Sequence, residues 1–149
     1  MGSKLPLVDD VVLNKAAIIE RCWRRVRQEY RDDPSRLSDQ TRQDAIVLNL
    51  ERACQAAIDL AMHAVARSHL GVPQDSAHGF DLLVVAGRIS STLARRLRAM
   101  VGFRNVAIHE YQALDLEIVR SVVERHEADF VELCAAFGVS IDPGRELPP

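Results

Sequence analysis

Apolar residues recur along this chain at the spacing of one face of an α-helix. In the range 8–31 the repeat consists of Val11, Val12, Ala16, Ile19, Trp23, Val26 and Tyr30. In the range 116–137 it consists of Val119, Val122, Val123, Phe130, Leu133, Cys134 and Phe137. We therefore predict a long helix in each range. Asp115 is suited to begin the second of them as its N-cap, and Gly138 is suited to end it.

Another long helix is predicted over residues 39–69. Asp32-Asp33-Pro34-Ser35 ends the first helix, and either Ser38 or Asp39 can cap the next one. Its polar side chains gather in one stripe, which consists of Asn49, Arg52, Gln55, Asp59, His63 and Arg67. Almost all other residues from 45 to 66 are apolar, which is more than one packing face needs. We expect a second packing partner, either another subunit or a central position in the bundle.

Shorter helices are predicted in the middle of the chain. Ser76 is a candidate N-cap for a helix through about residue 86, and Gly87 suggests a break after it. A further helix over residues 92–101 would be closed by Gly102, and the next helical segment would begin after that glycine. No alternating strand pattern, internal repeat or glycine-rich phosphate loop is present. The predicted fold class is therefore all-α, a bundle of four to five helices formed by residues 1–138. Residues 139–149, with three prolines and a glycine, are expected to form a flexible tail.

The charge of the chain is unevenly distributed. The net charge of −2 over 149 residues excludes a strongly basic protein, so any contact with nucleic acid must come from a local patch. Between Asp81 and Glu110 there is no acidic residue, and the basic residues in that interval are Arg88, Arg95, Arg96, Arg98 and Arg104. This patch indicates phosphate or nucleic-acid binding, although it could also serve only to keep a short helix soluble. The same two alternatives apply to Arg21, Arg24, Arg25 and Arg27 near the end of the first helix.

Cysteine usage and hydropathy indicate the compartment. The three cysteines, Cys22, Cys54 and Cys134, are widely spaced and form no CxxC pair, which favours a reducing environment and buried, inert thiols. No secretory signal and no run of about 18 apolar residues occur, so we expect a cytoplasmic protein without a membrane partner. The histidines lack the spacing of a metal site. We expect no metal and no cofactor.

The residues best suited to catalysis lie between Arg104 and Tyr111. Arginine is a permanent planar cation that binds phosphate in a bidentate manner, and histidine transfers protons near neutral pH. Together they are sufficient for metal-independent cleavage of RNA. In a regular helix Arg104 and Tyr111 share a face, whereas His109 lies about 140° around the axis from Arg104. Either the segment bends, or two copies of the chain supply complementary groups to one phosphate.

This stretch resembles the R-x4-6-H-x-Y signature of HepT-type HEPN toxins. Arg104, His109 and Tyr111 occupy the three motif positions, and Asn105 follows the arginine as is common in that family. Residues 48–61 are similar to the family's second helix, and the resemblance extends over about residues 12–137. It implies a HEPN-type helical domain and a homodimer that brings two motifs into one cleft.

The resemblance also implies a function. It implies the toxin of a HEPN–MNT toxin–antitoxin pair (type VII), a metal-independent endoribonuclease. His109 would act as general base or acid on the 2′-hydroxyl or the leaving oxygen, and Arg104 would stabilise the phosphorane. The products would be a 2′,3′-cyclic phosphate and a 5′-hydroxyl. Tyr111 would contact phosphate and would be blocked when a nucleotidyltransferase antitoxin adds AMP to it.

Several assignments have simpler alternatives. Asn105, Asn49 and Asp59 are possible supporting residues, but Asn49 and Asp59 also fit a solvated stripe. Tyr111 fits a packing role at a helix end, and His126 fits a core or interface histidine. The whole protein also fits a non-catalytic dimeric binding module that is partner and substrate of a nucleotidyltransferase. The two functional hypotheses differ at His109, which only the ribonuclease requires.

Overall fold

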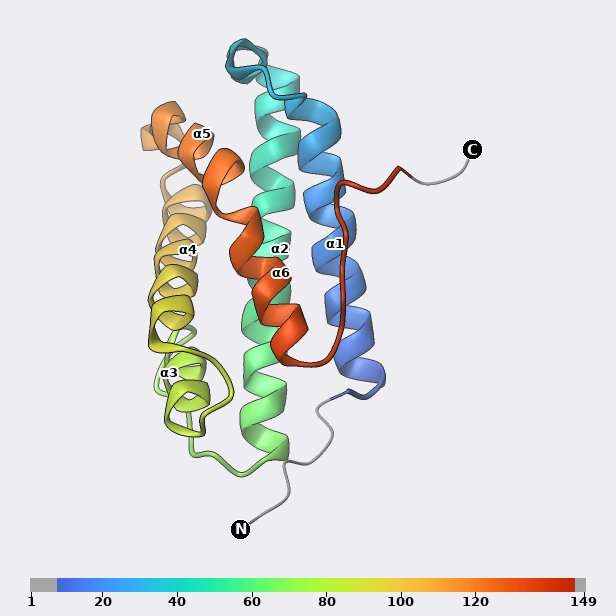
Figure 1. The fold of residues 1–149 in the computed structure, drawn as a ribbon. Coiled ribbons are helices and arrows are strands. Elements are labelled where there is room, and N and C mark those ends of the chain that lie inside the picture. The colour runs from blue at the N-terminus through green and yellow to red at the C-terminus, as the bar shows by residue number, and fades with distance from the viewer. Residues whose placement is uncertain (1–7, 147–149) are drawn as a thin grey trace.

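The computed structural model describes residues 8–146, which form six α-helices and two short 3-10 helices (Figure 1). The order of the elements is α1 (Asp10–Tyr30), η1 (Pro34–Ser38), α2 (Gln40–Arg67), α3 (His78–Val85), α4 (Ser91–His109), η2 (Tyr111–Ala113), α5 (Leu116–Arg125) and α6 (Glu127–Ala136). No strand occurs among these residues. The predicted all-α bundle is therefore confirmed, with more helices than the four to five expected.

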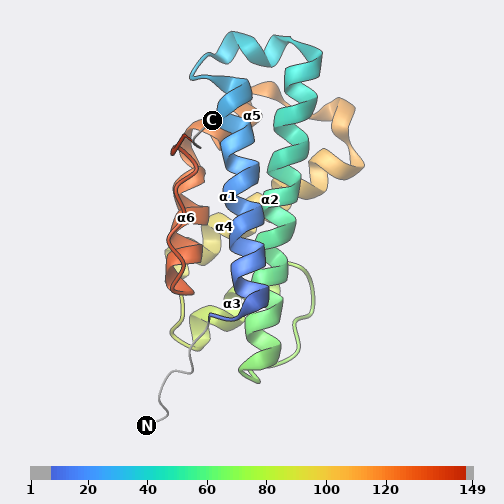
Figure 2. The same ribbon diagram turned by 90° about the vertical axis from the view of Figure 1, so that its right-hand side faces the viewer.

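The two long helices α1 and α2 begin at side-chain caps and lie side by side along their lengths (Figure 2). The carboxylate of Asp9 accepts a hydrogen bond from the Val12 backbone N–H at 2.9 Å and so caps α1. Asp39, one of the two predicted caps, accepts from the Arg42 N–H at 3.1 Å and caps α2. The extended backbone of Asp33 next to Pro34 separates the two helices, as predicted.

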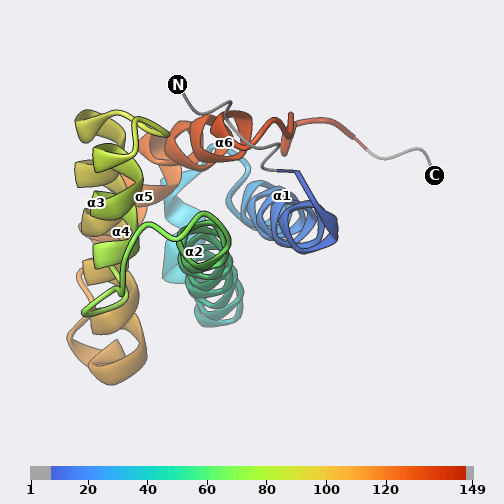
Figure 3. The same cartoon turned by 90° about the horizontal axis from the view of Figure 1, so that it is seen from below.

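The helix α2 occupies the centre of the bundle. Viewed from below, α1 lies on one side of it and α3 and α4 lie on the other (Figure 3). Its buried residues are Ile46, Val47, Leu50, Ala53, Cys54, Ala56, Ala57, Ile58, Leu60, Ala61, Ala64 and Val65. Among its large apolar side chains only Leu48 is exposed. Two explanations were expected for the surplus apolar surface of α2, namely another subunit or a central position in the bundle. The structure shows the central position.

The helix α4 does not end at Gly102, which corrects the predicted boundary. It runs without interruption from Ser91, capped by the Ser90 hydroxyl, to His109. A C-cap glycine requires a left-handed backbone, and Gly102 has none. The predicted cap of α3 was also wrong. Asp75, not Ser76, accepts hydrogen bonds from the backbone N–H groups of Ala77 and His78.

The predicted last helix is divided at His126 into α5 and α6, which is a third correction (Figure 1). His126 is half-buried, and its Nδ1 lies 2.8 Å from the buried carboxylate of Asp129. The division changes the direction of the chain and lets α6 pack on α1. There the ring centroids of Phe130 and Trp23 are 5.3 Å apart, and both side chains are buried.

The segment after Gly138 packs on α1, which differs from the expectation of a flexible tail for residues 139–149. Gly138 ends the helix with a φ of +84°, as predicted. Ile141 is buried, the Asp142 N–H donates to Glu20 at 2.7 Å, and Arg24 donates to the backbone carbonyl of Arg145 at 3.3 Å. One apolar anchor and these contacts hold residues 139–146, although their composition prevents a helix. Residues 147–149 lie outside the described part of the chain.

None of the helices described between residues 8 and 146 is both long enough and apolar enough to cross a membrane.

Candidate active site

The guanidinium of Arg104 lies between α4 and α2. Its Nη2 donates to Oε1 of Gln55 at 2.6 Å, and its Nη1 donates to Oδ1 of Asn105 at 3.1 Å. The Nε atom is buried and has no hydrogen-bond partner within residues 8–146. The predicted cation is therefore half-buried and held by two amide oxygens, one from α2 and one from its own helix.

Gln55 is itself oriented by an acidic neighbour one turn along α2. Its Nε2 donates to Oδ1 of Asp59 at 2.8 Å, and Oδ2 of Asp59 lies 3.2 Å from Nζ of Lys15 on α1. An ionised carboxylate only accepts hydrogen bonds and a guanidinium only donates them. A glutamine amide, with one donor end and one acceptor end, matches both neighbours. The row Lys15–Asp59–Gln55–Arg104 therefore holds the arginine in place from two helices.

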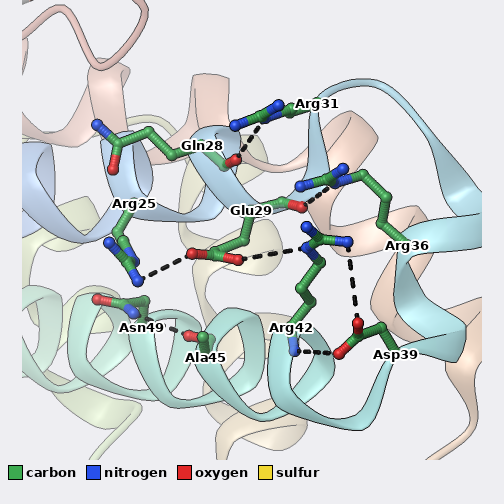
Figure 4. A network of polar contacts seen from close by, with 9 residues as sticks. All are labelled: Arg25, Gln28, Glu29, Arg31, Arg36, Asp39, Arg42, Ala45 and Asn49. Carbon is green, nitrogen blue, oxygen red and sulfur yellow. Dashed lines mark hydrogen bonds and ion pairs between the residues drawn. The ribbon is translucent and has the colours of Figure 1, made fainter.

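The three predicted supporting residues have different surroundings. Asn105 contacts Arg104 directly, and Asp59 contacts it only through Gln55. Asn49 donates to the backbone carbonyl of Ala45 in its own helix at 2.8 Å, as Figure 4 shows.

Two further groups of α2 are influenced by the charge of Arg104. Burial raises the pKa of the half-buried Glu51 carboxyl, and the nearby Arg104 charge partly opposes that rise. Burial also raises the pKa of the Cys54 thiol to about 12, and its Sγ lies 3.6 Å from the carbonyl of Met100. Cys54 therefore stays a neutral, inert thiol at physiological pH. All three cysteines are free and buried.

His109 is the last residue of α4 and is exposed. It makes no hydrogen bond through its ring within the described part of the chain. Because α4 is continuous to His109, no break in the helix separates Arg104 from His109. On one regular helix, residues five apart are separated by about 140° around the axis. The His109 side chain therefore leaves α4 in another direction than Arg104, whose guanidinium contacts Gln55 of α2.

Tyr111 is the first residue of η2, which follows α4 after one residue, and its hydroxyl contacts the first turns of α2. The hydroxyl donates to Oδ1 of Asp44 and accepts a hydrogen bond from Nε2 of Gln43 at 3.3 Å. Burial and the Asp44 carboxylate together raise the pKa of Tyr111 to about 12. The half-buried phenol therefore stays protonated, and it has specific polar partners in addition to its packing against the core.

One face of α2 thus contacts two of the three motif residues, Arg104 and Tyr111. Asp44, Glu51 and Gln55 follow one another at spacings of seven and four residues, so their side chains lie along the same face. Gln55 was noticed in the sequence only as one member of a polar stripe, and Asp44 and Glu51 were missed. The signal that could have found them is this spacing. Counting back along α2 from Gln55 by four and then by seven residues leads to Glu51 and Asp44 on the same face of the helix.

Half of the arginines outside the motif are paired with acidic side chains. In the predicted basic patch, Arg98 lies 3.4 Å from Asp81, and Arg96 lies 3.7 Å from Asp129. On α1 the cluster is similarly paired: Arg25 lies 2.8 Å from Glu29 (Figure 4). The remaining pairs on α1 are Arg24 with Glu20 and Arg27 with Glu127. The cluster on α1 therefore fits an ion-paired solvated face better than a phosphate-binding strip.

Comparison with known proteins agrees with this arrangement. Residues 17–137 match the family described as Ribonuclease HepT-like. The chain is 44% identical over 123 residues to the mRNA nuclease HepT of Shewanella oneidensis, which covers 83% of this chain and 92% of the relative.

Solved structures of related toxins share the fold. One is the tri-AMPylated HEPN toxin of Shewanella oneidensis in complex with MNT antitoxin, with a TM-score of 0.83 and 41% identity, covering 88% of this chain and 98% of that chain. Another is a toxin–antitoxin structure with AMP-PNP, with a TM-score of 0.83 and 41% identity, covering 87% of this chain and 99% of that chain.

The helical bundle and its Arg–His–Tyr motif define a protein of the HEPN toxin class. More specifically, the chain belongs to the HepT-like ribonuclease family. The family, the fold and the ribonuclease class expected from the sequence are confirmed. The roles of individual residues stay predictions.

Proposed function

We propose that this chain is the ribonuclease toxin of a HEPN–MNT toxin–antitoxin pair and acts on RNA in the cytoplasm. The observation that carries the proposal is the arrangement of one eight-residue stretch: Arg104 is anchored on α2, while His109 is exposed at the end of the same helix. The relative of the same family is named an mRNA nuclease. The free, buried cysteines agree with a reducing compartment.

The chemistry needs two copies of the chain. Arg104 would stabilise the charge that develops on the phosphorane, and His109 would transfer the proton of the 2′-hydroxyl or of the leaving 5′-oxygen. Because both groups project in different directions from one continuous helix, we expect Arg104 of one protomer and His109 of its partner to share a phosphate. The products are a 2′,3′-cyclic phosphate and a 5′-hydroxyl, because the 2′-oxygen is the nucleophile.

Exposed apolar side chains around the motif support such a homodimer. Val106 and Ile108 flank His109 on α4, Leu116 and Ile118 begin α5, and Leu48 lies on the α2 face that contacts the motif. Their exposed fractions range from 37% for Leu116 to 50% for Ile118. Apolar surface gathered at one end of the molecule is suited to association with a second copy. The interface we propose therefore uses α4 and α5 as well as the exposed part of α2.

The toxin would be silenced at Tyr111 by a nucleotidyltransferase antitoxin. A related toxin has been solved in a tri-AMPylated state with its MNT antitoxin. AMP on Tyr111 would add negative charge beside the motif and so compete with the phosphate of the RNA.

The test is the substitution His109→Ala. General acid–base catalysis typically contributes about 10²–10⁴-fold, so we expect RNA cleavage and growth arrest to be lost while circular dichroism and the melting temperature stay unchanged. Gln112→Ala, which alters a neighbouring exposed residue, serves as the control and should cut RNA like the parent protein. If His109→Ala cuts RNA at the parental rate, the chain is better described as a binding module for the nucleotidyltransferase.

A further inference from the structure

The hydroxyl oxygen of Tyr111 has one lone pair that is free to form a bond. A phenol oxygen carries one hydrogen and two lone pairs. The hydrogen is donated to Oδ1 of Asp44, and one lone pair accepts the hydrogen bond from Nε2 of Gln43. The contacts of the described residues leave the second lone pair unused. A bound electrophile can therefore approach this oxygen without breaking either hydrogen bond.

The carboxylate of Asp44 is held in position by its own helix. Nε2 of Gln40 donates to the same Oδ1 atom at 2.7 Å, from one turn earlier in α2. Asp44 is exposed and Tyr111 is half-buried, so the pair lies at the surface where a partner protein can reach it. Glu51 faces the same phenol from further along α2 but makes no hydrogen bond to it within residues 8–146.

Resting on the function proposed above, we infer that Asp44 is a catalytic residue for the modification of Tyr111: it is the general base, supplied by the toxin chain itself, for AMP transfer. As Oη of Tyr111 attacks the α-phosphorus of ATP, the bond between that phosphorus and the oxygen bridging to the β-phosphorus breaks. Pyrophosphate leaves, and the phenolic proton passes to Oδ1 of Asp44. The products are the tyrosyl–AMP ester, pyrophosphate and one proton, which Asp44 later releases to water.

The chemistry of the phenol explains why a base is needed here. A hydroxyl is a weak nucleophile unless an adjacent group takes its proton. With the pKa of Tyr111 raised to about 12, the fraction of phenolate at neutral pH is negligible. The proton must therefore leave during the attack, and Asp44 is the acceptor already bonded to it.

The experiment compares the rate of AMP incorporation in the parent protein and in Asp44→Asn. Each is incubated with the MNT-type nucleotidyltransferase and ATP, and intact mass is followed with time. Asparagine keeps the size of the side chain and an acceptor oxygen but cannot take a proton, so we expect a rate about 10²-fold lower. Glu132→Gln, which neutralises an exposed carboxylate of α6 that makes no contact with Tyr111, should be modified at the parental rate.

A second measurement separates a base from a residue that only positions the phenol. Replacing Tyr111 with a ring-fluorinated tyrosine, whose phenol is more acidic, should remove most of the deficit of Asp44→Asn, because less of the proton transfer then depends on a base. An equal rate in Asp44→Asn and the parent overturns the inference, and so does a deficit that fluorination leaves unchanged. If the parent itself gains no AMP, the inactivation step of the proposed function fails together with the role of Asp44. If the parent gains AMP and Asp44→Asn gains it equally fast, only the role of Asp44 fails.

Discussion

Gln55 on α2 and Arg104 on α4 are joined by a hydrogen bond of 2.6 Å between Oε1 and Nη2, across 49 residues of sequence. Asp59 and Lys15 hold the other end of the glutamine amide. The direction of the proposed catalytic cation is therefore set by the packing of α4 on α2 and, through Lys15, by α1. This relationship leads to the first of four predictions.

Replacing Gln55 with leucine should lower the efficiency of RNA cleavage by about 10- to 100-fold. Hydrogen bonds to charged groups contribute about 1.5–3 kcal/mol, and about 1.4 kcal/mol corresponds to a factor of ten. The measurement is kcat/KM with an RNA oligonucleotide. Gln28→Leu, which alters an exposed glutamine of α1, is the control. Parental kcat/KM in Gln55→Leu would mean that Arg104 needs no anchor on α2.

Replacing Ile118 with arginine should convert the proposed dimer into monomers and abolish RNA cleavage. Ile118 is 50% exposed at the start of α5, beside the other apolar residues around the motif. A charge there cannot be buried against a second copy without a large desolvation cost. Sedimentation measures the assembly. Val85→Arg, at a side chain 87% exposed on α3, should leave the dimer intact. A variant at 118 that remains dimeric and active contradicts the proposed interface.

Replacing Gly102 with alanine should stabilise the protein by about 1 kcal/mol. Gly102 lies inside α4, no atom is within 4 Å of the position of an added Cβ, and alanine favours a helix by about that amount. The measurement is the free energy of unfolding in urea. Destabilisation would instead indicate that the helix ends at Gly102, as the sequence alone suggested, because alanine is strained in a left-handed cap.

The stability of the protein should fall in acid partly through Asp9. The backbone N–H of Val12, the His63 side chain and Arg67 favour the ionised carboxylate and lower its pKa from 3.8 to about 2. The unfolded chain takes up this proton at a higher pH than the folded chain. The contribution is therefore complete above pH 3.8 and is lost as the pH falls toward 2.

The measurement compares the parent with Asp9→Asn. The difference in unfolding free energy between the two proteins should be largest near neutral pH and should shrink between pH 4 and 2. A difference that stays constant over this range would mean that the charge of Asp9 does not stabilise the start of α1.

The helices were predictable because their signals are local. The apolar repeats of α1 and α2, the break at Pro34 and the caps at Asp39 and Asp115 depend on residues within a few positions of one another. Where such signals failed, long-range packing had overridden them. Gly102 continues a helix because α4 packs along α2, and His126 divides one because α6 turns to bring Phe130 onto α1.

By itself, the sequence determined the helical class, the surplus apolar surface of α2 and the Arg104, His109 and Tyr111 motif with the family it belongs to. Only the tertiary structure decided which residues contact that motif. Gln55 and Asp44 lie 49 and 67 residues away from their partners Arg104 and Tyr111. Such contacts depend on how two helices pack, and the packing follows from the whole core rather than from any short pattern in the chain.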